Sequence, residues 1–157
     1  MQPQSIIFHE RLANWSRQIR PRLRGWPIRW SETRSGQELA RSASRSACPI
    51  FLIDLADRPR QALEDLDAGL VAAPMALSLV LDPLSHDGIG TMARELGATL
   101  VLSGVVVPPR VVALLQRWLP LARQRSEADG WSVPIGAVVD PWGRLEPFAS
   151  FGPFSSD

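Results

Sequence analysis

Polar side chains that could do chemistry follow four short apolar runs of the sequence. They are His9, Glu10, Asp54, Asp82 and Ser103. Carboxylate oxygens are the ligands that hard divalent cations prefer, so Glu10, Asp54 and Asp82 could together hold such a cation. Acids at the ends of strands are more often solvated or paired with arginine. We therefore expect no metal, no cofactor and no catalytic residue, and keep the cation set as an alternative.

Other catalytic and cofactor-binding patterns do not fit the chain. No serine lies in a Gly-x-Ser-x-Gly elbow, so a hydrolytic triad has no nucleophile. The loop from His86 to Gly90 lacks the third glycine of a dinucleotide fingerprint and the Asp-x-His spacing of cobalamin-binding loops. Cys48 is the only cysteine, so it cannot form an internal disulfide. With no signal peptide and no membrane-length apolar run, the sequence predicts a cytoplasmic protein.

The elements that must position these residues alternate along the chain. Apolar runs of strand length occur at residues 5–8, 28–30, 50–53, 76–81 and 99–102. Segments with helical spacing of apolar residues lie between and after them, at residues 12–23, 36–47, 59–73, 92–96 and 109–122. This alternation predicts an α/β domain with a parallel sheet and helices on both faces.

The character of single runs refines this architecture. Residues 50–53 form a continuous apolar run, which is typical of a strand buried on both faces. Residues 28–30 alternate apolar and polar, as an edge strand would. Five units in about 125 residues suit the doubly wound flavodoxin-like order 2-1-3-4-5, in which ligands bind outside the carboxyl ends of the strands. We therefore expect residues 1–125 to form one domain.

Residues 126–157 differ from the rest of the chain, because they are rich in proline, glycine and aromatic residues. The turn residues 140–143 favour a short β-hairpin there. Solvated tails rarely carry so many aromatic rings, so we expect this extension to pack on the domain or on a partner. Together with the last helix it gives the predicted partner interface: Leu114, Trp118, Leu121, Trp131, Trp142, Phe148, Phe151 and Phe154.

Several stretches resemble the receiver domain of bacterial response regulators, over roughly residues 5–125. Residues 49–55, Pro-Ile-Phe-Leu-Ile-Asp-Leu, resemble the third receiver strand, which ends in the phosphoacceptor aspartate. Residues 97–102, Gly-Ala-Thr-Leu-Val-Leu, are similar to the start of the fifth strand. Residues 35–39 and 109–115 look like the beginnings of the second and last receiver helices. The resemblance implies a CheY-like signalling domain with Asp54 at the phosphoacceptor position.

The same resemblance implies a phosphoacceptor pocket that has lost its chemistry. Working receivers hold Mg²⁺ with two acids after strand one and with the phosphoacceptor, and they end strands four and five with a hydroxyl residue and a lysine. Here strand one is followed by His9-Glu10, strand four ends in Asp82 and strand five ends in Ser103. The chain contains no lysine. An acid at Asp82 beside Asp54 would also repel a phosphoryl group and raise a carboxyl pKa.

The beginning of the chain offers a second interpretation. Residues 1–50 carry nine arginines and only three acids, and tryptophans are interleaved with the arginines. Arginine contacts phosphate and tryptophan stacks on bases, so this region could bind nucleic acid. The spacing of the tryptophans is that of a core-facing helix side, and the net charge of the chain is only +1. A solvated basic face is the preferred interpretation.

These observations lead to three functional hypotheses. The first is a non-enzymatic pseudo-receiver, which acts in signalling through a protein partner or as a homodimer. The second is a basic adaptor that contacts nucleic acid through its first helix. The third is a flavodoxin-like domain that binds a metal or a small molecule through Glu10, Asp54 and Asp82.

Overall fold

Residues 3–129 are described by a computed structural model, in which strands and helices alternate along the chain. The strands are β1 (Gln4–His9), β2 (Ile28–Thr33), β3 (Ile50–Asp54), β4 (Leu77–Asp82) and β5 (Leu100–Ser103). The helices are α1 (Asn14–Arg22), α2 (Gly36–Ala43), α3 (Pro59–Ala72), α4 (Ile89–Glu95) and α5 (Pro108–Asp129). Each predicted strand and helix is present, and the ends differ from the sequence expectation by up to seven residues, most at the end of α5.

The five strands form one parallel sheet in the order β2-β1-β3-β4-β5, which confirms the predicted doubly wound architecture. The alternating run at residues 28–30 lies in the edge strand β2, as predicted. Because every strand points the same way, the residues that end them meet at one edge of the sheet. This carboxyl edge is where the polar residues singled out from the sequence lie.

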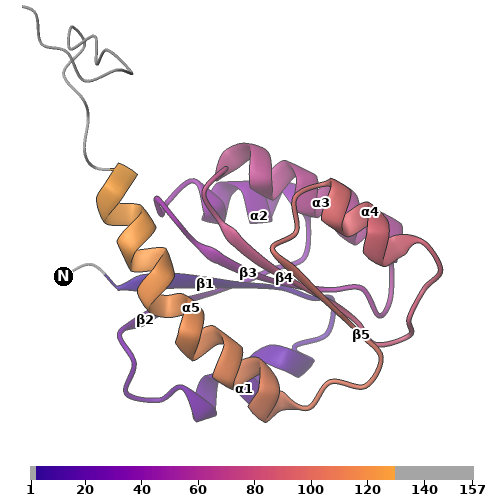
Figure 1. The fold of residues 1–157 in the computed structure, drawn as a ribbon, viewed down its shortest axis with the longest axis horizontal. Coiled ribbons are helices and arrows are strands. Elements are labelled where there is room, and N and C mark those ends of the chain that lie inside the picture. Colours follow the sequence, from indigo (N-terminus) through magenta and orange to yellow (C-terminus); the bar gives the residue numbers. More distant parts are fainter. Residues whose placement is uncertain (1–2, 130–157) are drawn as a thin grey trace, which may run out of the picture.

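Helices cover both faces of the sheet in two separate layers (Figure 1). α1 and α5 lie on one face, and α2, α3 and α4 lie on the other. Both α1 and α5 start at the carboxyl edge and run back toward the amino ends of the strands. The molecule is therefore a three-layer sandwich with two distinct outer surfaces.

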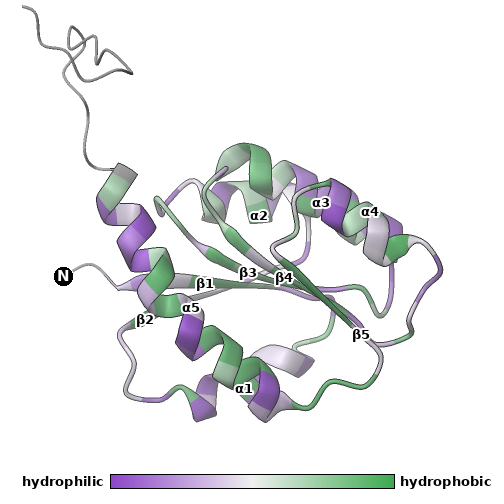
Figure 2. Ribbon diagram, in the orientation of Figure 1, coloured by the Kyte–Doolittle hydropathy of each residue, from purple (hydrophilic) through white to green (hydrophobic). Residues whose placement is uncertain are grey.

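The strand side chains divide between the two layers with the period of two that a strand imposes. In β3, Leu52 packs in the core beneath α1 and α5, while Phe51 and Ile53 pack in the core beneath α2, α3 and α4. All three are fully buried, so the continuous apolar run is buried on both faces as predicted. Figure 2 shows hydrophobic residues concentrated on these central strands and on the inner sides of the helices.

Helix ends explain two differences from the sequence expectation. α5 continues through Asp129, so the expected boundary after residue 125 falls inside a helix. Residues 123–129 contain no glycine or proline, and helix formation therefore continues to the next glycine in the sequence. At α1, Pro21 lies within the last turn and the helix ends directly after it. Within residues 3–129, no helix combines the length and apolar character that a membrane crossing requires.

Candidate functional site

Four of the five predicted pocket residues end a strand at the carboxyl edge, and Glu10 follows β1 directly. His9 pairs with Ile53 across β1 and β3, and Asp82 pairs with Ser103 across β4 and β5. Asp54 ends β3 between these two pairs, where it lies opposite Leu81. The strand register places these residues side by side. Whether they form one site depends on what each side chain contacts.

Glu10 caps helix α1. The carboxylate is buried and accepts backbone hydrogen bonds from Asn14 at 3.1 Å, from Trp15 at 2.8 Å and from Ser16 at 2.8 Å. The first amides of a helix have no partner inside the helix, and negative charge is favourable at that end. Both Glu10 oxygens are therefore occupied by the amino terminus of α1.

His9 is the centre of a buried polar chain that the sequence reasoning missed. Its Nδ1 lies 2.9 Å from Thr33 Oγ1, and its Nε2 lies 2.8 Å from Asp65 Oδ2. Gln61 donates to the other Asp65 oxygen at 3.1 Å. Gly36 packs against the same carboxylate, because a Cβ there would lie 2.7 Å from Asp65 Oδ1. The signal in the sequence was an acid on the apolar side of the third helix, one position before Leu66.

Asp54 is the most exposed of the three carboxylates. Its side chain accepts a hydrogen bond from the backbone of Ala56 at 3.1 Å. Burial raises the pKa of this carboxyl, the charges of Glu10 and Asp57 raise it further, and the Ala56 hydrogen bond opposes them. Within residues 3–129, no arginine or histidine nitrogen forms an ion pair with it.

Asp82 is almost fully buried and is paired with the loop that follows its strand. Its Oδ2 accepts from the backbone of His86 at 2.8 Å, and its Oδ1 lies 2.6 Å from His86 Nδ1. The sequence reasoning expected Asp82 to raise a carboxyl pKa by repelling Asp54. The acids that raise the pKa of Asp54 are Glu10 and Asp57, because Asp82 turns its oxygens toward His86 instead.

A cavity of about 410 Å³ opens beside Asp54 at the ends of β1 and β3. His9, Glu10 and Asp54 line it, whereas Asp82 and Ser103 do not. The predicted pocket is thus divided, with the acid of β4 outside the cavity that Asp54 lines. Three arginines and four further polar residues complete its polar lining: Arg11, Arg34, Arg58, Asn14, Asp57, Gln61 and Asp65.

All three arginines of this cavity are themselves engaged. Arg11 pairs with Asp57, as does Arg58 at 3.9 Å, and Arg34 donates through Nε to the backbone oxygen of Arg11 at 3.2 Å. In the part of the chain that the structure describes, no three histidine, cysteine or acidic side chains are grouped to hold a metal ion. The cation set of Glu10, Asp54 and Asp82 is therefore not assembled by these side chains.

The predicted partner interface is only partly visible. Leu121 is exposed on α5, and Leu114 lines a groove of about 240 Å³ together with Leu100 and Leu102 of β5. Trp118 was expected at this surface, but it is 8% exposed and packs in the core under α1 and α5. A helix position that faces the sheet buries even a large ring. The other members lie outside the described residues: Trp131, Trp142, Phe148, Phe151 and Phe154.

Comparison with known proteins finds likeness in structure only. No protein-family model matches the chain, and no curated protein matches it in sequence. A response regulator from Thermotoga maritima superimposes with a TM-score of 0.62 at 9% identity, over 75% of this chain and 98% of that one. A response regulator from Burkholderia pseudomallei, solved with a phosphorylated aspartic acid, gives 0.56 at 19% identity over 83% and 76%.

A third solved structure is the receiver domain of a sensor histidine kinase from Pseudomonas aeruginosa, with a magnesium ion coordinated in its active-site cleft. It gives a TM-score of 0.56 at 20% identity, over 75% of this chain and 98% of that one. The strand order, the two helical layers and these superpositions agree. The chain therefore has the fold of response-regulator receiver domains.

Proposed function

We propose that this chain is a non-catalytic, receiver-like interaction module that is not phosphorylated by the Mg²⁺-dependent route of working receivers. The capping role of Glu10 carries the proposal. In a receiver, the acid after β1 must offer oxygens to a cation, but here both oxygens accept amide hydrogens of α1. The residues present do not fit Mg²⁺, which needs several carboxylate oxygens. The oxygens of Glu10 and of Asp82 already have hydrogen-bond partners, and Asp54 alone of the three predicted carboxylates has a single one.

The remaining pocket positions support the same proposal. The chain has no lysine, and β5 ends in Ser103, so no lysine ammonium group can neutralise a phosphoryl group at Asp54. β4 ends in Asp82, which adds negative charge where a receiver has a hydroxyl, and its oxygens are bound to His86. Burial also raises the pKa of Asp54, which makes its carboxylate costlier to maintain and a doubly charged phosphoryl group costlier still.

Incubation with acetyl phosphate or beryllofluoride in the presence of Mg²⁺ tests this directly. We expect the intact mass and the thermal melt of the full chain to stay unchanged, and the Asp54→Asn variant to respond to these reagents no differently. A working receiver domain under the same conditions serves as the positive control. A stoichiometric, acid-labile phosphate that disappears in Asp54→Asn would overturn the proposal.

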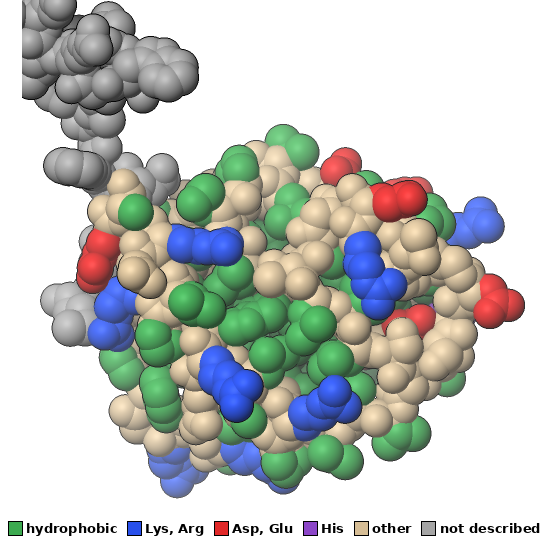
Figure 3. Space-filling model, viewed as in Figure 1, with side chains coloured by type: hydrophobic (Ala, Val, Ile, Leu, Met, Phe, Trp, Pro, Cys, Tyr) green, Lys and Arg blue, Asp and Glu red, His purple; other side chains and the backbone are tan. Residues whose placement is uncertain are grey.

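An interaction role is supported by the surface at β5 and α5. The groove there is lined by Leu100, Leu102 and Leu114, and Arg110 and Arg117 flank it. Figure 3 shows apolar side chains exposed in this region of the molecule, with arginines around them. A protein partner or a second copy of this chain would bury the three leucines of this groove, and the aromatic residues of 130–157 would add to the same interface.

A further inference from the structure

The charged residues of the described chain are segregated between the two helical layers. Residues 14–27 and 108–129, which carry α1, the loop after it and α5, contain eight arginines and two acids, Glu127 and Asp129. Glu32 of β2 lies on the same side, where it pairs with Arg20. The helices and loops of the opposite layer, residues 34–49, 55–76 and 83–99, contain six arginines and seven acids. A net charge of +1 for the whole chain conceals this asymmetry. The sheet thus separates a basic outer surface from one of nearly balanced charge.

Most arginines of the basic layer are exposed and have no acidic partner. The exposed members are Arg17, Arg22, Arg24, Arg110, Arg117 and Arg125. Within the described residues, Arg20 is the only arginine of this layer in an ion pair, with Glu32 at 2.8 Å. Like charges gathered on one surface are unfavourable in the free protein, so a bound polyanion would relieve their repulsion.

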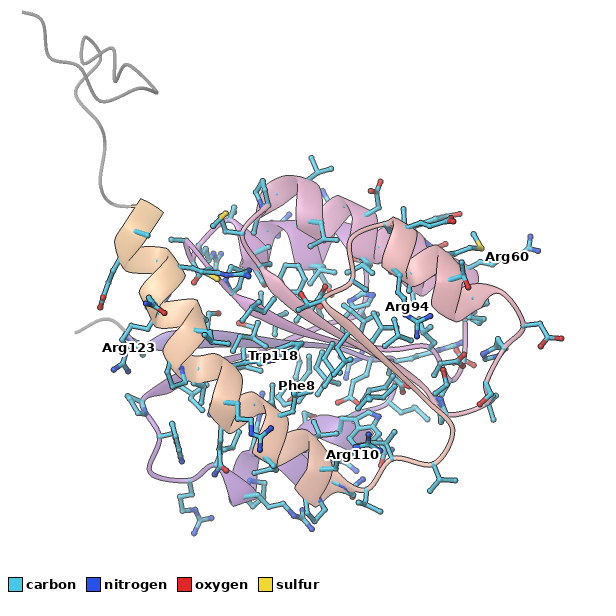
Figure 4. The ribbon with its side chains drawn as sticks, viewed as in Figure 1. Phe8, Arg60, Arg94, Arg110, Trp118 and Arg123 are labelled. Carbon is cyan, nitrogen blue, oxygen red and sulfur yellow. The ribbon has the colours of Figure 1, made fainter. Side chains whose placement is uncertain are left out.

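The arginines form an extended array rather than a single cluster. On α5, Arg110 and Arg125 are separated by about 22 Å along the helix axis, at about 1.5 Å per residue. Figure 4 shows Arg110 near the start of α5 and Arg123 near its other end. In Figure 3, blue arginine side chains lie along and below α5, whereas blue and red side chains both occur over α3 and α4. An array of this length matches a chain of regularly spaced phosphates.

A cavity of about 350 Å³ lies at the end of α1, beside this array. Arg20, Arg24, Trp26 and Trp30 line it, and no acidic residue does. Trp26 is 41% exposed, which leaves part of its ring open to a ligand. Trp30 is held in place by two neighbours, because it stacks on Phe8 with centroids 5.6 Å apart and Arg20 lies 5.9 Å from its ring centre.

We propose that the α1/α5 surface binds single-stranded nucleic acid, with the arginines on its phosphates and one base stacked on Trp26. An acidic protein segment could pair with the arginines, but its carboxylates would not stack on the exposed ring of Trp26, whereas a base would. Planar guanidinium groups and exposed aromatic rings are the combination that binds single strands without sequence preference. This surface is separate from the cavity at Asp54, because Asp54 ends β3 at the carboxyl edge and Trp26 precedes β2 at the opposite edge.

Fluorescence anisotropy of the full chain with a labelled oligodeoxythymidine of about 20 nucleotides tests the surface. The test variant is Arg17→Gln/Arg24→Gln/Arg117→Gln/Arg125→Gln. The matched control removes the same charge from the opposite layer and its flanking loop: Arg41→Gln/Arg45→Gln/Arg60→Gln/Arg94→Gln. We expect the test variant to bind at least about tenfold more weakly, and its salt slope to fall by about 0.7 for each phosphate that is no longer neutralised. The control should bind like the unsubstituted protein.

The stacking residue is tested separately with Trp26→Ala. Without the stacked base, binding should weaken by roughly tenfold and the salt slope should stay unchanged, since no charge is removed. Thermal melts of all variants show whether the fold is retained. Equal weakening in the test and control variants would overturn the proposal, as would no binding by the unsubstituted protein at low salt. Binding of polyglutamate in preference to the oligonucleotide would also overturn it and assign the surface to an acidic protein.

Discussion

His9 Nε2 lies 2.8 Å from Asp65 Oδ2, which joins the end of the first strand to the middle of the third helix across 56 residues of sequence. Both side chains are buried, and Thr33 and Gln61 extend the contact on either side. This chain of polar groups connects β2, β1 and α3, and three of its members line the cavity at Asp54. It makes one wall of that cavity part of the folded core.

The His9–Asp65 contact predicts a stability effect. Asp65→Ala should lower the free energy of unfolding by about 2–3 kcal/mol, because it leaves the buried His9 and the Gln61 amide without their acceptor. Asp67→Ala, on the exposed side of the same helix, is the control and should change stability by less than about 0.5 kcal/mol. Urea denaturation measures both, and equal effects would show that the buried chain contributes nothing specific.

Glu10 should be required for the first turn of α1. Glu10→Ala removes three accepted amide hydrogen bonds, and we expect the free energy of unfolding to fall by about 2 kcal/mol, at the upper end of measured capping effects. Hydrogen exchange at Asn14, Trp15 and Ser16 should accelerate, while exchange in β3 should not. Glu10→Gln keeps one acceptor oxygen without the charge. Its free energy of unfolding should lie between those of the unsubstituted protein and Glu10→Ala. Unchanged exchange at these amides in Glu10→Ala would contradict the capping role.

The burial of Asp54 predicts a dependence of stability on pH. Its pKa is higher in the folded chain than in the unfolded chain, so the folded state binds the proton more tightly. Below 3.8, the pKa of Asp54 in the unfolded chain, its contribution to stability is fully present. This contribution is lost as the pH rises through the higher pKa of the folded chain. Asp54→Asn should be more stable than the unsubstituted protein at pH 7, and the difference should shrink in acid. Denaturant titrations at both pH values test this, and a destabilised Asp54→Asn at pH 7 would contradict it.

A cavity in the core at the central strand β3 should be strongly destabilising. Leu52 is fully buried under α1 and α5, so Leu52→Ala should cost about 2–5 kcal/mol. Val71→Ala provides the control, because Val71 is 75% exposed on α3. Chemical denaturation compares the two variants. A destabilisation below about 0.5 kcal/mol for Leu52→Ala would be that of a surface position.

Removal of residues 130–157 tests the predicted partner interface. The groove at Leu114 and the exposed Leu121 would lose the aromatic residues expected to cover them, and burying one such ring is worth about 1.5–3 kcal/mol. We expect the shortened chain either to dissociate or to aggregate, as measured by light scattering after gel filtration. Leu121→Gln in the shortened chain should reduce aggregation. If the shortened chain stays monodisperse, with the same stability and the same oligomeric state, residues 130–157 do not take part in the interface.

The sequence by itself was sufficient for the architecture. Runs such as residues 50–53 indicate burial on two faces, and the alternation at residues 28–30 indicates an edge, because backbone geometry forces successive strand residues onto opposite faces. The site residues at strand ends could be located for the same reason, since parallel strands end at one edge. The absence of lysine was equally plain without a structure.

Only the tertiary structure decided what those site residues contact. Glu10 could have offered its oxygens to a cation, but the amides of α1 occupy them. Asp82 faces His86, and His9 faces Asp65 on a helix far along the chain. Trp118 looked like an interface anchor and is buried instead. Periodicity gives the side of an element on which a side chain lies, whereas its hydrogen-bond partners depend on distances between segments that no local pattern encodes.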